Sequence, residues 1–166
     1  MSPRGVVPFG LDPARLAERY RGLLDLRSDA VIAAFRAVVR EPVADGVTGL
    51  DVGVHVEDGD GRWAPEVWLA WTGPHARITG ETGGRHAGAS GPLGVDVPGA
   101  GRFDHRYVAE GDGARVLSDV LGAWLAECWW KAGGWDLPVV GVLVHRDGPE
   151  AGREVRLTQR TERSAG

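Results

Sequence analysis

The sequence has 166 residues, a length typical of one domain, and 43% of them are hydrophobic, which is too many for a disordered chain. The formal net charge of -4 argues against a nucleic-acid backbone as the main partner, because phosphate binding needs a basic face, and it is compatible with a basic protein partner. The only cysteine, Cys128, excludes an intrachain disulfide and a cysteine cluster for zinc.

The first part of the chain predicts two helices. Asp12 suits the N-cap of the first helix, and Pro13 suits its first helical position. Ser28 is expected to cap the second helix, and Pro42 follows its end. The two segments therefore predict a helical hairpin with a short joint near residues 26–27.

From Val47 onward the apolar period changes to two, which is typical of strands. Segments 48–57 and 62–72 are predicted to form an antiparallel hairpin around a turn centred on Gly59 and Asp60, and this register pairs Val54 with Pro65 and Val52 with Val67. A slip by one residue would exchange the two faces. The residues expected on the buried face are Leu50, Val52, Val54, Val56, Trp63, Val67, Leu69 and Trp71.

The middle of the chain is less regular. Residues 76–81 predict a weak third strand and residues 103–109 a fourth. Between them, the Gly-rich segment 82–101 predicts a long loop with few core residues. A long helix is expected over residues 112–132, ended by Gly133, which readily takes the left-handed conformation of a C-cap.

The C-terminal part predicts two strands. The apolar run 139–144 indicates a central strand, and a turn leads from it into alternating residues within 154–159. The ends, about 1–10 and 160–166, are expected to be frayed. The whole order predicts an α+β fold in a single domain, 1–166. It has two N-terminal helices, a mostly antiparallel sheet of about five or six strands, and one long helix before the C-terminal hairpin.

Composition and segment lengths also indicate a source and a compartment. Lys131 is the only lysine and asparagine is absent, as in proteins encoded by GC-rich bacterial genomes such as those of actinobacteria. The first ten residues lack the apolar run of a signal peptide, and no segment approaches the roughly 20 apolar residues of a membrane helix. We therefore expect a cytoplasmic protein without membrane association.

The sequence carries no recognisable catalytic, metal or cofactor motif. The Gly-rich residues 80–85 lack the Lys-Ser or Lys-Thr pair of a P-loop, and no G-x-S-x-G elbow is present. Cys128 falls on the apolar stripe of the long helix, where a thiol is packing rather than a nucleophile. Because no two histidines have the helical i, i+4 spacing of a metal site, no metal and no cofactor is expected.

The histidines support one hypothesis, that of a small-molecule-binding domain or a small enzyme. His145 follows the apolar run and Asp147 lies two residues on, so the pair could serve acid–base chemistry, although an ordinary hairpin turn explains the same residues. His55 and His105 are the further candidates for a pocket between the sheet and the Gly-rich loop. Surface or packed histidines are the favoured interpretation for all of them.

Seven tryptophans are the strongest anomaly of the composition. Trp68 shares the polar face of its strand with Glu66, and Trp130 lies opposite the apolar stripe of the long helix. Either the N-terminal helices cover Trp130, which is the favoured interpretation, or it belongs to an interface; Trp129 is expected at a boundary. Tryptophan is enriched at binding hot spots, so the candidate partner-binding residues are Trp68, Trp130 and Glu66.

These features favour a non-enzymatic interaction protein that binds another protein. In size, acidity and tryptophan-rich α+β character, the chain resembles small acidic actinobacterial proteins, some of which look like immunity proteins of polymorphic toxin systems. The resemblance implies an inhibitor of that type, and it assigns no residue. A pocket of several hundred Å³ with two converging histidines would favour the small-molecule hypothesis instead. A flat patch around Trp68 or Trp130 would favour protein binding.

Overall fold

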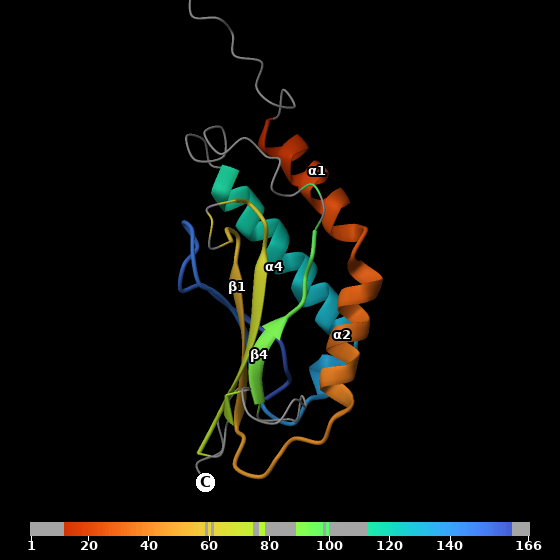
Figure 1. Ribbon diagram of the computed structural model, residues 1–166, viewed down its shortest axis with the longest axis vertical. Helices are drawn as coiled ribbons and strands as arrows, with labels where there is room; N and C mark the ends of the chain where they lie inside the picture. The colour runs from red at the N-terminus through yellow and green to blue at the C-terminus, as the bar shows by residue number, and fades with distance from the viewer. Residues whose placement is uncertain are drawn as a thin grey trace, which may run out of the picture.

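The computed structural model describes residues 12–58, 60, 62–74, 77–78, 89–97, 99 and 113–160. The described strands form a sheet in the order β3-β4-β2-β1-β5-β6, and the labelled helices α1, α2 and α4 lie together along one side of it (Figure 1). Two N-terminal helices, a long helix and C-terminal strands follow one another along the chain, which confirms the predicted α+β fold.

Within the described residues, backbone pairing defines six strands. Neighbours in the sheet run antiparallel, except that β1 is parallel to β5 and β3 is parallel to β4. The strands are β1 (Gly49–His55), β2 (Glu66–Thr72), β3 (Arg77–Ile78), β4 (Ala89–Leu93), β5 (Val140–His145) and β6 (Glu154–Arg156).

The buried face of the β1–β2 hairpin is confirmed. Each of the eight residues expected on that face is at most 6% exposed. The alternation of apolar and polar side chains therefore assigned the faces of these strands correctly, because successive side chains of a strand point to opposite sides.

The predicted register of this hairpin is wrong by two residues. Val54 pairs with Val67 instead of Pro65, a shift that keeps the faces and lengthens the connection between the strands. The carboxylate of Asp147 accepts hydrogen bonds from the backbone amides of residues 56–57, at 2.8 and 3.0 Å. These amides are therefore taken by the neighbouring loop, while Pro65 has no N–H to contribute to a ladder.

The segment 82–101 contains β4, so the prediction of a long loop is wrong for residues 89–93. Leu93 is 2% exposed and Val97 is 7% exposed, so the segment also contributes to the core. Residues 89–93 include glycine and proline, which are depleted in strands, so the sequence pattern did not predict this strand. Of the weak third strand, β3 covers two residues, and the predicted strand 103–109 lies outside the described residues.

The helices start largely as expected. In α1 (Pro13–Asp25), the side chain of Asp12 accepts a hydrogen bond from the backbone N–H of Arg15 at 2.9 Å, which confirms the predicted cap. The prediction that Ser28 caps α2 (Ser28–Arg40) is wrong, because Ser28 is the first helical residue. Its hydroxyl accepts a hydrogen bond from Nε1 of Trp124 at 2.9 Å, the partner that a buried indole N–H requires.

Gly133 follows the long helix α4 (Gly113–Lys131), and its φ of 85° confirms the predicted left-handed cap. The expectation that Trp129 lies at a boundary is wrong. Its side chain is fully buried, and its Nε1 donates to the carbonyl oxygen of Leu157 at 2.8 Å. This helix therefore buries a second side, against the C-terminal strands, which a single apolar stripe did not predict. Among the described helices, none is both long and apolar enough to cross a membrane.

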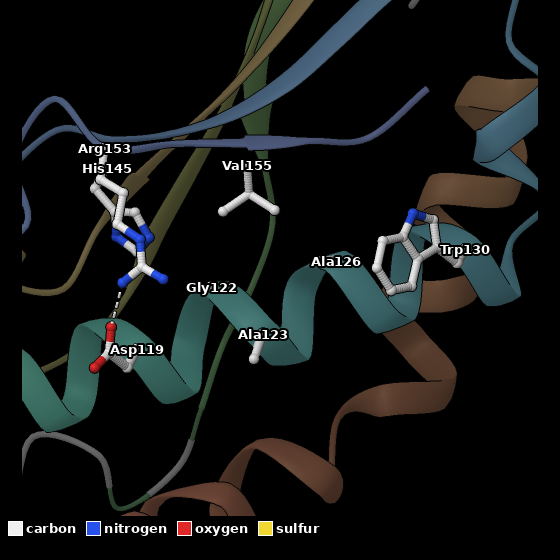
Figure 2. A pocket seen from close by; sticks show the side chains of 8 residues that line it. All are labelled: Asp119, Gly122, Ala123, Ala126, Trp130, His145, Arg153 and Val155. Atoms are coloured by element: carbon white, nitrogen blue, oxygen red, sulfur yellow. Dashed lines mark hydrogen bonds and ion pairs between the residues drawn. The ribbon is translucent and has the colours of Figure 1, made fainter. Parts of the chain in front are cut away.

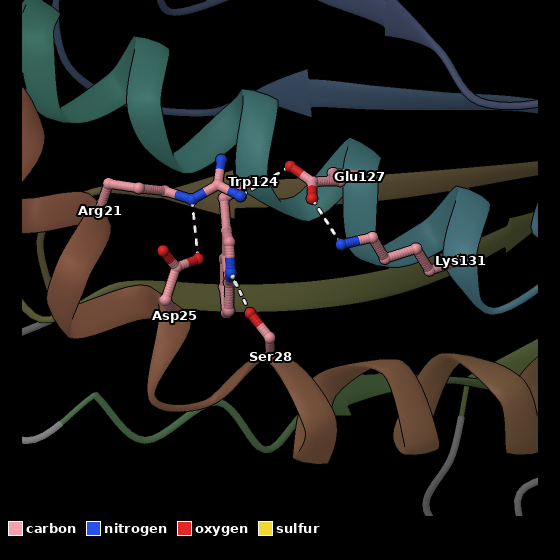
Figure 3. Close-up of polar contacts among 6 residues, drawn as sticks. All are labelled: Arg21, Asp25, Ser28, Trp124, Glu127 and Lys131. Atoms are coloured by element: carbon pink, nitrogen blue, oxygen red, sulfur yellow. Dashed lines mark hydrogen bonds and ion pairs between the residues drawn. The ribbon is translucent and has the colours of Figure 1, made fainter.

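Polar side chains connect the N-terminal helices to α4 by hydrogen bonds (Figure 3). Glu127 accepts hydrogen bonds from Arg21 and from Lys131, both at 2.6 Å. The hydrogen bond from Arg21, followed by that from Lys131, lowers the pKa of Glu127 from 4.5 to about 2. With the Trp124–Ser28 bond, these contacts dock α1 and α2 on this side of α4. The expectation that these helices cover Trp130 is therefore wrong, and Trp130 is 50% exposed.

Candidate functional site

A pocket of about 240 Å³ lies between α4 and the C-terminal strands β5 and β6. Its polar residues gather at one end and Trp130 lies at the other, with small and apolar residues between them (Figure 2). The lining residues are Asp119, Gly122, Ala123, Ala126, Trp130, His145, Arg153 and Val155.

His145 is the most deeply placed polar residue of this pocket. It is the last residue of β5, beside Val54 in the parallel register, so its ring lies on the side of the sheet that faces α4. It is 3% exposed. A Cβ atom on Gly122 would lie 2.8 Å from Nε2 of His145, so the glycine allows the helix to approach the imidazole.

No hydrogen bond to either ring nitrogen of His145 is formed within the described part of the chain. Burial, and then the positive charge of Arg153, lower the pKa of His145 from its ordinary value of 6.5, against smaller opposing effects of Glu150, Asp119 and Asp147. At neutral pH the imidazole is therefore uncharged and offers one donor and one acceptor.

Arg153 closes the polar end of the pocket. Its Nη1 donates to Oδ1 of Asp119 at 2.5 Å and to Oε2 of Glu150 at 3.4 Å. Figure 2 shows the Arg153–Asp119 bond spanning from the strand side to α4, next to His145. The guanidinium charge is therefore balanced inside the protein.

Trp130 is held from the side away from this polar end. Its ring makes an edge-to-face contact with Trp135, with centroids 6.2 Å apart and planes at 85°. The guanidinium of Arg156 lies 4.9 Å from the centre of the Trp135 ring, an arrangement typical of a cation–π contact. The half-exposed indole of Trp130 therefore packs against Trp135, which in turn packs against Arg156.

Of the other residues predicted for a pocket, His55 and Asp147 are not part of this one. His55 lies on the opposite face of the sheet, because it points away from the buried Val54. Asp147 binds backbone amides of the β1–β2 connection instead of His145. His105 lies outside the described residues. The pocket also differs in place from the predicted one, since α4, β5 and β6 form its walls.

The outer face of the sheet carries the other candidate residues. Trp68 is 48% exposed on β2, and Glu66 is exposed two residues earlier on the same face. Gly53 pairs with Trp68, and the side chain of Arg146 lies over this glycine, 3.3 Å from the position of a Cβ atom. Arg146 also makes an ion pair with Asp51 at 3.8 Å, so Asp51 balances part of its charge.

Several lining residues were not identified from the sequence as a site. On one side of α4, the small residues Gly122, Ala123 and Ala126 lie between Asp119 and Trp130 at helical spacing. This stripe was visible as an unusually apolar second side of the helix, and it was the signal that could have located the groove. Arg153 and Val155 gave no signal of their own, because only the fold brings β6 to the helix.

The comparisons with known proteins give no match: the chain matches no protein-family model, no curated protein and no solved structure. Among the described residues, no group of three or more His, Cys, Asp or Glu side chains could hold a metal ion.

Proposed function

We propose that this chain is a binding protein that docks a basic segment of another protein on the outer face of its sheet, through Trp68 and Glu66. The observation that carries the proposal is the 48% exposure of Trp68 on β2, which has a paired strand on each side. A large indole near the middle of a sheet face is a ready anchor, because tryptophan dominates many binding hot spots.

Glu66 favours a cationic side chain as the group that Trp68 receives, and Asp51 balances part of the charge of Arg146 on the neighbouring strand. An indole face attracts Arg or Lys, and a neighbouring carboxylate adds a charge-assisted hydrogen bond. Glu66 supplies that carboxylate, and it makes no ion pair within the described part of the chain. The net charge of -4 adds a weaker attraction for a basic partner at longer range.

The proposal also includes a class of partner, a toxin, and a compartment, the bacterial cytoplasm. An immunity-type inhibitor, which neutralises a toxin by binding it in the bacterial cytoplasm, is the class of protein we infer. A single buried cysteine, Cys128, fits a reducing compartment. The pocket beside α4 supports a small-molecule function less well, because it is smaller than expected and, of the two candidate histidines that the structure describes, His145 lines it and His55 does not.

Site-specific photocrosslinking, followed by affinity measurement, tests this function. A benzophenone amino acid is placed at position 68 in the bacterium that encodes the chain, and at position 26 as a control. Leu26 is an apolar residue that is 75% exposed at the joint of the N-terminal helices. We expect a protein that crosslinks from position 68 and not from position 26.

The purified partner is then titrated against variants of this chain. Trp68→Ala is expected to weaken binding by 2 kcal/mol or more, about 30-fold, as at other hot spots. Glu66→Gln is expected to weaken it less and to reduce its dependence on salt, because a charge is lost. Leu26→Ala is expected to leave the affinity unchanged. A partner that binds Trp68→Ala as tightly as wild type, or no crosslink specific to position 68, contradicts the proposal.

A further inference from the structure

The pocket beside α4 supports a second site, which does not depend on the face around Trp68. We propose that this pocket binds a small, planar, uncharged compound whose hydrogen-bonding group meets His145 and whose ring packs beside Trp130.

The volume limits the size of the compound. The pocket measures about 240 Å³. A closed apolar cavity of about 150 Å³ admits benzene, whereas sites for drug-sized ligands span about 300–1,000 Å³. A compound of one or two rings therefore fits.

His145 indicates the polar group of the compound. Its side chain is 3% exposed and lines the pocket, and no partner for its ring nitrogens lies in the described part of the chain. Neither ring nitrogen is among the fully buried polar atoms that lack a hydrogen bond, so the imidazole is open to the pocket, and a ligand group can bond to it in place of water. An amide or a similar uncharged group can both donate to the imidazole and accept from it.

The charges at this end exclude a strongly charged head group. Arg153 is already bonded to Asp119 and Glu150, and Asp147 also lies close enough to act on His145. A ligand carboxylate would compete with Asp119 and Glu150 for the guanidinium of Arg153. The negative charges of these two residues and of Asp147 would also repel it. An ammonium would have to displace the guanidinium of Arg153 to reach the carboxylates of Asp119 and Glu150. An uncharged group leaves the internal ion pair intact.

The far end suits a ring. Ala126 and Val155 give an apolar wall between His145 and Trp130, and Figure 2 shows both between the polar end and the indole. Because Trp135 holds Trp130 in place, a ring that packs beside the indole does not have to order it first. Such pre-organisation favours affinity.

Nuclear magnetic resonance with three matched probes tests the proposal: benzamide is uncharged, benzoate is anionic and benzylammonium is cationic. We expect benzamide to shift the imidazole signals of His145 and the indole N–H of Trp130 in a saturable way, with a dissociation constant of about 10 mM or lower, as befits a compound of so few atoms. Benzoate and benzylammonium are expected to bind at least about tenfold more weakly.

Two variants of exposed alanines locate the binding. Ala123→Phe places a ring in the pocket wall and is expected to weaken benzamide binding at least about tenfold. Ala37→Phe makes the same change on an exposed position of α2 and is expected to leave binding unchanged. Trp130→Leu, which removes the indole and keeps the position apolar, is also expected to weaken it.

Three results would overturn the proposal. The first is the absence of any saturable shift with benzamide up to about 10 mM, a range that covers weak binding by a fragment. The second is equal benzamide affinity in wild type and in both Ala123→Phe and Trp130→Leu, which would place the compound elsewhere. The third is tighter binding of benzoate or benzylammonium than of benzamide, which would contradict the uncharged head group.

Discussion

Among single residues, His145 has the environment that most strongly affects its chemistry. Its ring is buried between β5 and α4, against Gly122, and burial lowers its pKa below 6.5. Arg153 lowers this pKa further, while Glu150, Asp119 and Asp147 raise it by smaller amounts. The folded protein therefore holds a neutral imidazole under conditions in which the unfolded chain begins to protonate it.

This difference predicts a pH dependence of stability. As the pH falls through about 6.5, the unfolded state binds a proton that the folded state does not yet accept, so the free energy of unfolding decreases. Between about pH 7 and pH 5.5, His145→Gln is expected to lose less stability than wild type, by at most about 1.4 kcal/mol per pH unit, the limit for one proton.

Urea unfolding of both proteins at several pH values measures the effect. Between about pH 7.5 and pH 8.5, where His145 is neutral in both states, the difference between the two proteins is expected to stay constant. Parallel curves for wild type and His145→Gln throughout the acidic range would mean that His145 titrates normally in the folded protein.

Among the elements, the β1–β2 hairpin shows where local pattern is sufficient and where it fails. Alternation over β1 and β2 assigned the buried face correctly, because the period of a strand depends on its own residues. The observed register goes with a contact from outside the hairpin, since the carboxylate of Asp147, about 90 residues away, binds the amides of Val56 and Glu57. A contact between distant segments cannot be predicted from the sequence of either one alone.

Asp147 is therefore expected to matter for the stability of this connection. Asp147→Ala leaves two backbone N–H groups without their acceptor and is expected to cost about 1–3 kcal/mol in the free energy of unfolding. Asp147→Asn keeps one carbonyl oxygen and is expected to cost less. Asp60→Ala is the control, because the side chain of Asp60 is 82% exposed in the same connection, and a change within about 0.5 kcal/mol is expected.

Denaturant unfolding of the three variants checks this prediction. A loss for Asp147→Ala no larger than that for Asp60→Ala would mean that water replaces the carboxylate without cost. The register would then need another explanation.

At the scale of the whole molecule, the fold class and the order of the elements other than β4 could be predicted, because the cap of α1, strand alternation and the glycine after α4 act locally. The site could be predicted only in part. His145 and Trp130 were both identified, but in two separate hypotheses, and only the packing of β5 and β6 against α4 brings them to one pocket. Trp68 and Glu66 were identified together because they share one strand face.

The arrangement of helices and sheet also determines which of the tryptophans are buried and which are exposed. Trp124 and Trp129 are fully buried between the helices and the sheet, whereas Trp68 and Trp130 are about half exposed on two different sides. The central claim of this account is that these two exposed indoles serve binding and contribute little to the core.

The most direct test is the free energy of unfolding of Trp68→Ala and Trp130→Ala, measured in urea beside Trp124→Ala. For the first two variants we predict losses of about 1 kcal/mol or less, because their side chains are half exposed. For Trp124→Ala we predict a loss of about 3–5 kcal/mol, since this change leaves a cavity and removes the bond to Ser28. Losses of about 3 kcal/mol or more for both Trp68→Ala and Trp130→Ala would place both side chains in the core and contradict the account.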